Sequence, residues 1–258
     1  KIKINRGKIL DRNNEIIATS IDTYDLYVDI KKSLDKEKLK NVLSEIFEDK
    51  ESAFFERIFN KEQYSLIKKD ISPTELNKLK SVGDPAIKLH ESKKRVYPQH
   101  NIFSNLIGLK TNELISKIEK NMNKELVKGK NLKLTVDLRI QNIVREELYK
   151  SLIEYKAKAA LAVVMNVKSG EIFSMVSLPD FNPNYPKSIL PKTENNLNAE
   201  ARYEMGSTLK IFNAAMVYES ESEIQFNEFD ISEGYQITNE KHILDDHIDE
   251  KILNFDDV

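Results

Sequence analysis

Alternating apolar and polar positions predict strands at the beginning of the chain. Residues 1–10 (KIKINRGKIL) alternate, residues 15–20 (EIIATS) form a second short apolar run, and residues 22–30 (DTYDLYVDI) give a third. The polar stretch 11–14 suits a hairpin turn between the first two strands, because asparagine tolerates a positive φ angle. We therefore expect a platform of strands.

The pattern becomes helical between residues 35 and about 80, where lysine and glutamate are frequent. Two apolar stripes recur at helical spacing there: Leu39, Val42, Leu43 and Ile46, then Phe54, Phe55, Ile58 and Phe59. Residues 89–98 (LHESKKRVYP) return to extended character. This first part of the chain is expected to be a strand platform that carries a helical insertion.

A second set of elements follows residue 131. Residues 132–137 (LKLTVD) predict a strand that ends at a helix cap, Asp137, and residues 138–157 predict a helix. Its apolar stripe consists of Ile140, Val144, Leu148 and Leu152. Two apolar runs, 159–167 and 171–177, predict a hairpin with a buried first strand, and a loop rich in proline and asparagine follows.

Composition narrows the possible functions. The 258 residues allow one large domain or two ordinary ones, and a net charge of −2 gives no indication of a nucleic-acid partner. The chain has no cysteine, which excludes disulfides, thiolate metal sites and cysteine nucleophiles. No membrane span or secretory signal is evident in it. Because the chain begins at Lys1 and not at methionine, we expect upstream residues to have been removed.

A Ser-x-x-Lys spacing, which occurs in acyl-transfer sites, is present three times. The copies begin at Ser33, Ser65 and Ser207. The first two lie in or beside the charged helical region, where a lysine is most simply a solvated surface group. Only the third follows a glycine and precedes an apolar run, so it is the candidate for chemistry.

At the third copy, Ser207 and Lys210 are three residues apart, so on a helix their side chains are neighbours. Leu209, Phe212 and Met216 predict a core-facing stripe and hence a buried helix. A desolvated lysine holds its proton less firmly and can serve as a base, while the serine N–H can help to stabilise an oxyanion. The alternative is that Ser207 only caps the helix and that Lys210 is a surface group.

The third copy resembles the active-site serine motif of penicillin-binding proteins and serine β-lactamases. Five further segments are similar to motifs of class B penicillin-binding proteins, in the same order along the chain: residues 6–20 (RGKILDRNNEIIATS), 95–108 (RVYPQHNIFSNLIG), 115–126 (ISKIEKNMNKEL), 132–141 (LKLTVDLRIQ) and 163–184 (VVMNVKSGEIFSMVSLPDFNPN). The resemblance implies an α+β chain. Residues 1–130 would form the pedestal, or dimerisation, domain, and residues 131–258 the first part of a transpeptidase α/β domain. It also implies that Arg6 and Glu119 meet at the base of the platform.

The function implied by this resemblance is D,D-transpeptidation of peptidoglycan stem peptides. Ser207 would attack the penultimate D-Ala, Lys210 would take the serine proton, and β-lactam antibiotics would acylate the same serine. No cofactor or metal is implied. The implied location is the inner membrane, with one N-terminal anchor outside this chain and a periplasmic domain. Glycosyltransferase and other division proteins of the membrane are the implied partners.

The chain departs from the family pattern at several places. Asn14 replaces the usual glycine, and Met205 replaces a proline found in many members. The Ser-x-Asn and Lys-Thr/Ser-Gly motifs of the family do not occur after Ser207, so these 258 residues are expected to hold half of the active site and to be inactive alone. The short join between the Glu-Lys helix and the next strand predicts that residues are missing between Leu126 and Asn131.

Alternative readings remain open at this point. A β-lactam sensor or β-lactamase would share the serine motif but does not need the strand platform, and a non-catalytic scaffold could recruit division partners through residues 1–130. The stretch near His247 favours the septal division type over the elongation type. Its acidic neighbours Asp245, Asp246 and Asp249 are interpreted as a solvated loop and not as a metal site.

Overall fold

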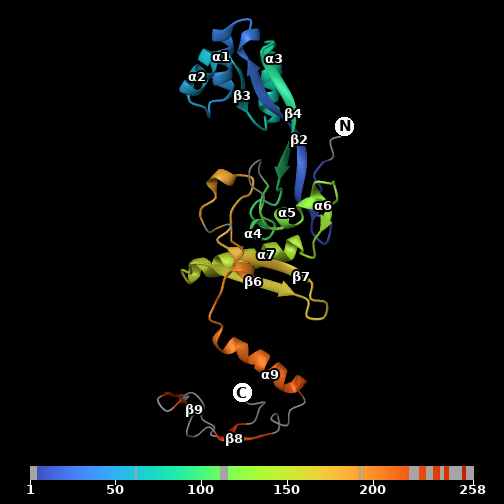
Figure 1. Ribbon diagram of the computed structural model, residues 1–258, viewed down its shortest axis with the longest axis vertical. Coiled ribbons are helices and arrows are strands. Elements are labelled where there is room, and N and C mark those ends of the chain that lie inside the picture. Colours follow the sequence, from blue (N-terminus) through green and yellow to red (C-terminus); the bar gives the residue numbers. More distant parts are fainter. Residues whose placement is uncertain are drawn as a thin grey trace. The chain divides into compact units, whose positions relative to one another are not determined.

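The chain divides into two compact units, Lys1–Ala201 and Arg202–Val258, which are described separately (Figure 1). The computed structural model describes residues 5–61, 63–110, 116–191, 193, 195–220, 227–230, 235–238, 241–243 and 252–253. Strands and helices are mixed along the first unit, so the predicted α+β class is confirmed.

One sheet runs through the platform. Its members are β1 (Ile9–Leu10), β2 (Ile16–Asp29), β3 (Tyr64–Lys68), β4 (Ile87–Val96) and β5 (Leu132–Lys133). The strand order is β3-β2-β1-β5, and β4 also pairs with β2. The β2–β4 ribbon is antiparallel from the pair Thr19–Val96 to the pair Val28–Ile87. This ribbon connects the two lobes of the platform, each of which has its own apolar core (Figure 1).

The predicted hairpin at residues 11–14 is confirmed. β1 and β2 pair antiparallel, and Asn14 adopts a φ of 71°, the left-handed conformation that asparagine tolerates. The third predicted strand is not separate, because residues 22–29 continue β2 without a break. No glycine, proline or asparagine interrupts residues 15–30, and β4 supplies a partner along that length.

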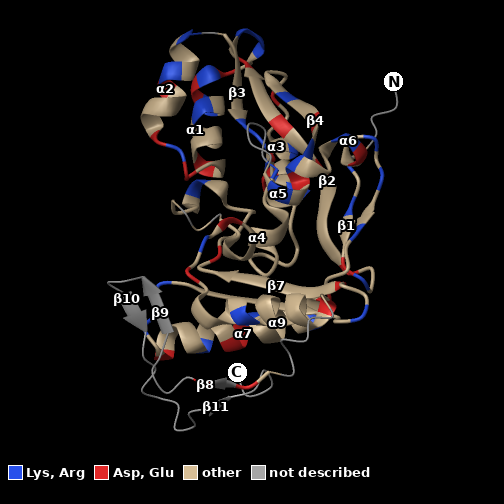
Figure 2. Cartoon of the chain, turned by 60° about the horizontal axis from the view of Figure 1, so that its bottom comes forward, with Lys and Arg blue, Asp and Glu red and all other residues tan. Residues whose placement is uncertain are grey.

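The first lobe, called the head lobe here, packs three helices beside the far half of β2. They are α1 (Lys36–Ile46), α2 (Ser52–Lys61) and α3 (Pro73–Val82), and charged positions recur along α1 and α2 (Figure 2). The core consists of Leu26, Val28, Ile30, Leu39, Leu43, Phe47, Phe55, Ile58, Phe59, Ile67, Ile71, Leu79 and Ala86. Ser72 and Glu75 form a reciprocal capping box at the start of α3. The helical insertion also contains β3, a strand that the helical pattern did not predict.

The second lobe, the base lobe, surrounds β1 and β5. It contains the short helices α4 (Ser104–Ile107), α5 (Lys117–Asn121) and α6 (Asn123–Leu126). Its core consists of Ile9, Ile17, Ala18, Tyr97, Phe103, Ile107, Leu109, Leu126, Val136 and Phe181.

Residues 126–131 form a short connection between α6 and β5, and the absence of residues between Leu126 and Asn131 stays a prediction. The backbone forms a compact turn in which the Gly129 amide donates to Leu126 and the Lys130 amide donates to Glu125. Gly129 has a φ of 83°, which lets a short connection reverse the chain and enter β5 directly.

Helix α7 (Leu138–Glu154) follows the base lobe and lies against the hairpin of β6 (Ala160–Met165) and β7 (Ile172–Leu178). Its predicted stripe is only half-buried. The prediction of a buried first hairpin strand is also wrong, since Leu161, Val163 and Met165 of β6 are exposed on alternate positions. Alternation of this kind belongs to a strand with one covered face. Two short segments, η2 (Pro186–Ser188) and α8 (Leu197–Glu200), complete the unit.

The second unit contains η3 (Gly206–Leu209) and α9 (Lys210–Glu219). Two short strand pairs follow: β8 (Phe229–Asp230) with β11 (Ile252–Leu253), and β9 (Tyr235–Thr238) with β10 (Lys241–Ile243). Among the residues that the structure describes, no helix has both the length and the apolar character that a membrane crossing requires.

Candidate active site

Ser207 and Lys210 lie on one tight turn at the start of the second unit. Gly206 adopts a φ of 55°, which directs the chain into the single 3-10 turn of η3 that contains Ser207. Lys210 is the first residue of α9, and its amide donates a hydrogen bond to the Ser207 carbonyl. The sequence prediction that both side chains sit at a helix start is therefore confirmed.

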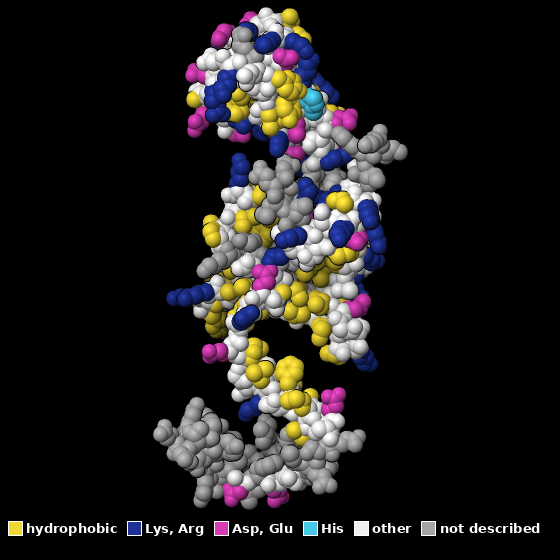
Figure 3. Space-filling view, viewed as in Figure 1, with side chains coloured by type: hydrophobic (Ala, Val, Ile, Leu, Met, Phe, Trp, Pro, Cys, Tyr) yellow, Lys and Arg dark blue, Asp and Glu magenta, His cyan; other side chains and the backbone are white. Residues whose placement is uncertain are grey.

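The predicted burial of this helix is wrong for the chain as it stands. Ser207 and Lys210 are exposed, and Leu209, Phe212 and Met216 are 52%, 65% and 59% exposed. Their apolar side chains lie at the surface of the unit (Figure 3). An amphipathic helix is buried only where another element covers its apolar stripe, and within the second unit no described residue covers this one.

The structure gives Ser207 no capping role. The N-cap positions of η3 and α9 are Met205 and Leu209, and neither has a side-chain cap bond. In the described part of the chain, no side-chain hydrogen bond joins Ser207 or Lys210 to another residue. By contrast, the Ser33 hydroxyl donates to Asp84, and Lys68 of the Ser65 copy pairs with Glu75 at 2.8 Å. The Ser65 hydroxyl also donates, to the Gln63 carbonyl. Among the described residues, the third copy thus differs from the other two because its serine hydroxyl has no hydrogen-bond partner.

The loop before the serine turn is anchored in two places, to the base lobe and to α7. Asp180 accepts from the Arg145 guanidinium at 2.6 Å and from the Asn101 amide at 3.1 Å. Farther along, the Asn184 side chain bonds both backbone groups of Tyr97, accepting from the N–H and donating to the carbonyl. Sequence reasoning quoted this loop as a motif but missed these anchors, although the paired Pro-Asn residues signalled a fixed turn.

The start of α7 is fixed by residues of the β1–β2 turn. Asp137 accepts from the Arg139 amide as the predicted cap, and it also accepts from the Asn13 side chain at 2.9 Å. Buried Asp11 accepts from the Leu138 amide and from two amides of its own turn. Two hydrogen bonds from the Arg139 side chain hold the pKa of Asp137 well below its usual range. The platform hairpin and the first helix of the following region therefore share one polar junction.

Gln141 is the residue of α7 that is most deeply buried. Its amide nitrogen donates to the Ile102 and Met175 carbonyls, and its oxygen accepts from the Met175 amide and the Ser174 hydroxyl. All these bonds lie within the first unit, where they join α7 to β7 and to the base lobe. The hydrogen bonds within the first unit therefore explain the role of the glutamine at the end of the segment 132–141.

Arg6 and Glu119 meet at the base of the platform, as the resemblance implied. Arg6 Nη2 lies 2.6 Å from Glu119 Oε2, and Arg95 Nε lies 2.7 Å from Glu119 Oε1. Glu119 is fully buried, and its one carboxylate is the partner of two positively charged guanidinium groups. Burial, together with the Glu119 charge, raises the pKa of the Tyr97 hydroxyl. The sequence did not predict that Arg95 would pair with Glu119, although Arg95 is the first residue of the segment 95–108.

No group of metal-binding side chains is present among the described residues. The predicted solvated loop around His247 lies outside them.

Two family profiles match the chain. The profile of the penicillin-binding protein dimerisation domain matches residues 1–138, and the profile of the penicillin-binding protein transpeptidase domain matches residues 160–254. The chain belongs to the penicillin-binding proteins. Ser207 and Lys210 fall inside the transpeptidase match, and the other two Ser-x-x-Lys copies fall inside the dimerisation match. The proposed boundary near residue 130 remains a prediction.

Several proteins with names of their own are similar in sequence to this penicillin-binding protein. A probable peptidoglycan D,D-transpeptidase FtsI of Caulobacter vibrioides is 26% identical over 98% of the chain and 44% of that protein. Stage V sporulation protein D of Bacillus subtilis is 27% identical over 84% of the chain and 39% of its own length. The peptidoglycan D,D-transpeptidase FtsI of Escherichia coli is 25% identical over 81% and 42%. The chain therefore spans less than half the length of these relatives.

A solved structure shares the fold. The peptidoglycan synthetase from Bifidobacterium adolescentis superposes with a TM-score of 0.62 and 17% identity, covering 96% of this chain and 55% of that one. At this identity the similarity establishes the arrangement of the chain and not its chemistry.

Proposed function

We propose that this protein is a peptidoglycan D,D-transpeptidase of cell wall synthesis, with Ser207 as its nucleophile and Lys210 as its base. The observation that carries the proposal is the position of this one Ser-x-x-Lys copy inside the transpeptidase match. The hydroxyl of its serine has no hydrogen-bond partner among the described residues, and the serine and the lysine lie on one turn. The similarity to proteins named D,D-transpeptidases supports the same reaction.

In the proposed reaction, the Ser207 oxygen attacks the carbonyl carbon of the penultimate D-Ala of a stem peptide. Lys210 accepts the serine proton, and the bond to the terminal D-Ala breaks as that residue leaves with a proton. An amine of a neighbouring stem peptide then attacks the acyl-enzyme, which forms the cross-link and returns the hydroxyl to Ser207. The Ser207 N–H is one donor for the oxyanion. This chemistry requires that the exposed apolar face of α9 be covered, because only a desolvated lysine is an effective base near neutral pH.

The biological setting is proposed on the same basis. The name FtsI of several relatives and the residues near His247 favour cell division over elongation. We place the catalytic region in the periplasm, with an anchor in the inner membrane, and we expect a membrane glycosyltransferase to supply glycan strands. β-Lactam antibiotics are expected to acylate Ser207 in place of the stem peptide.

Two other functions are less well supported. A β-lactam sensor or β-lactamase would not require the dimerisation domain that matches residues 1–138. A non-catalytic scaffold would not require a serine and a lysine held together on a turn in the transpeptidase match.

Labelling of the full-length protein with a fluorescent penicillin tests the proposal. Ser207→Ala is expected to abolish the label, and Lys210→Ala is expected to slow acylation by about 10²–10⁴-fold, the usual contribution of a general base. Ser65→Ala is the matched control, since it removes the serine of another Ser-x-x-Lys copy, and it should label normally. A label that persists in Ser207→Ala at the wild-type level would show that the nucleophile lies elsewhere.

A further inference from the structure

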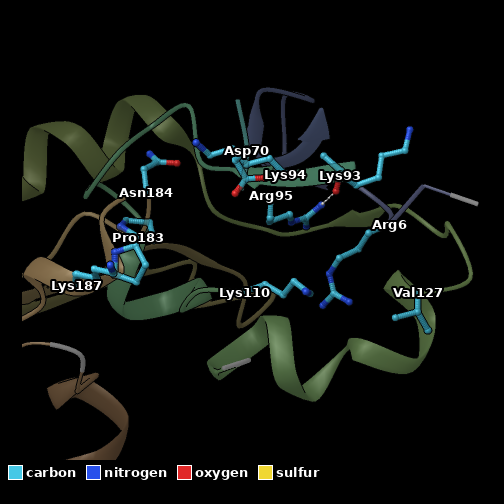
Figure 4. Close-up of a pocket in the computed structure, with 12 residues that line it drawn as sticks. Arg6, Asp70, Lys93, Lys94, Arg95, Lys110, Val127, Pro183, Asn184 and Lys187 are labelled. Atoms are coloured by element: carbon cyan, nitrogen blue, oxygen red, sulfur yellow. Dashed lines mark hydrogen bonds between the residues drawn. The ribbon is translucent and has the colours of Figure 1, made fainter. Parts of the chain in front are cut away.

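A basic cavity lies between the platform and the loop that precedes the serine turn. Its volume is about 570 Å³, which is within the range of small-molecule sites. Six cationic residues line it: Arg6, Lys93, Lys94, Arg95, Lys110 and Lys187 (Figure 4). All of them belong to the first unit. They come from the chain before β1, from β4, from the segment that follows α4 and from η2.

Among the described residues, fewer carboxylates than cations lie at the cavity, even when Lys110 is left out of the comparison. Asp70 is the one acidic residue among the described residues that line the cavity. Lys93 forms an ion pair with Asp22, and Arg6 and Arg95 share the single carboxylate of Glu119. The five cations other than Lys110 thus face three carboxylates, so the described residues give the cavity an excess of positive charge in a partly enclosed space, where charges are weakly screened.

Two cationic groups in the cavity have unfavourable surroundings. Burial and the neighbouring Arg6 guanidinium lower the pKa of Lys110 below its ordinary value. The Arg95 side chain is only 2% exposed, and its Nη2 atom is buried without a hydrogen-bond partner among the described residues. A buried donor without an acceptor is unfavourable, so an anion that reached this wall of the cavity would stabilise it.

We propose that this cavity is a binding site for a phosphate-bearing ligand. Cations from four separate segments suit a tetrahedral group whose oxygens point in several directions, whereas a planar carboxylate offers two oxygens on one side. A phosphate monoester also carries close to two negative charges at neutral pH, which matches the excess of positive charge better than a carboxylate does.

The cavity is larger than one phosphate group requires, so it has room for the group that carries the phosphate. The lining includes Asn184 and Lys187 of the loop that leads to the serine turn. A bound phosphate would thus contact both the platform and this loop. The phosphate could belong to a soluble molecule or to a lipid headgroup, and the chemistry of recognition is the same for both.

Isothermal titration calorimetry of the full-length protein tests the site. The probes are inorganic pyrophosphate, citrate as a carboxylate of high charge, and vesicles that contain phosphatidic acid. Lys94→Ala and Lys187→Ala are each expected to weaken pyrophosphate binding by about tenfold, the effect of losing one charge-assisted hydrogen bond. Lys88→Ala, on the same strand β4 but outside the cavity lining, is the matched control and should bind as the wild type does.

Each outcome decides the proposal. Binding of pyrophosphate, of the vesicles or of both that is weakened by the two cavity variants and not by Lys88→Ala supports the site, and the probe that binds identifies the source of the phosphate. Absence of binding by both phosphate probes overturns it. Equal weakening by Lys88→Ala would indicate only the general surface charge, and equal affinity for citrate would overturn the assignment to phosphate. Penicillin labelling of each variant, which does not depend on phosphate, verifies that it is folded.

Discussion

At the scale of single residues, the buried carboxylate of Glu119 joins two arginines that are far apart in the sequence. It receives a guanidinium from the beginning of the chain and another from the end of β4, and it is fully buried. A buried charge that loses its partner is costly, because neither water nor another group replaces the lost interaction. The two arginines consequently depend on this one side chain.

We predict that Glu119→Gln lowers the free energy of unfolding by about 3–5 kcal/mol, since it leaves two buried guanidinium groups without their counter-charge. Urea denaturation of the full-length protein, monitored by far-ultraviolet circular dichroism, would measure the change. The control is Glu147→Gln, which removes a carboxylate whose ion pair with Lys150 is exposed, and its midpoint should match that of the wild type. Equal midpoints for the two variants would contradict the prediction.

Asp137 gives a prediction about pH. The Arg139 side chain holds the folded-state pKa of Asp137 below its unfolded value, so the ionised carboxylate stabilises the fold above about pH 4 and loses this effect as the pH falls further. Asp137→Asn keeps a capping side chain but removes the charge at the start of α7, which is worth about 1 kcal/mol. We expect this deficit at pH 7 and a smaller one at pH 3 in urea denaturation. The same deficit at both values would refute the electrostatic explanation.

At the scale of elements, local signals in the sequence were sufficient where the chain forms its own contacts. The turn at residues 11–14, the cap at Asp137 and the hairpin after residue 159 were all predicted from turn chemistry and period. The strand β3 was missed because five residues inside a helical region give too short a period to recognise. β2 was divided into two predicted strands because its length depends on pairing with β4, which is distant in sequence.

Gly7 gives a prediction about how β1 meets the turn before β5. A Cβ atom at this position would lie 1.9 Å from the Lys130 carbonyl oxygen, so the two segments cannot keep their spacing. Gly7→Ala is expected to destabilise the fold by about 3 kcal/mol through this overlap. Gly170→Ala is the matched control: its φ of 73° is strained for alanine, but no atom lies within 4 Å, and a cost of about 1 kcal/mol is expected. Thermal unfolding of both variants would show whether this order holds.

At the scale of the whole molecule, the sequence predicted the two residues of the candidate site but not the solvent exposure of the helix that contains them. The spacing of Ser207 and Lys210 and the preceding glycine are local features, and the structure reproduces them. The burial of Leu209, Phe212 and Met216 depends on what packs against α9, and no local pattern contains that information. The basic cavity is a similar case, since its cations come from segments that are far apart in sequence.

Because the platform has two separate cores, we predict that the head lobe and the base lobe can unfold independently of each other. Leu43→Ala removes a fully buried side chain from the head lobe and is expected to cost about 2–5 kcal/mol. Native-state hydrogen exchange of the full-length protein should show faster exchange in residues 30–86, whereas amides around Ile107 and Leu126 of the base lobe keep their protection. Ile107→Ala should give the reverse result. Loss of protection in both lobes with either substitution would show that the platform unfolds as one unit.

The junction of Asp11, Asn13 and Asp137 has a consequence for recombination between members of the family. A crossover at residue 130 would take the β1–β2 turn from one parent and the start of α7 from another. The bonds from Asp11 to the Leu138 amide and from Asn13 to Asp137 would then join residues that were never selected together. Crossovers after Gln141 leave this set of contacts within one parent. Functional chimaeras should therefore be recovered more often when the first turn of α7 is inherited together with the platform.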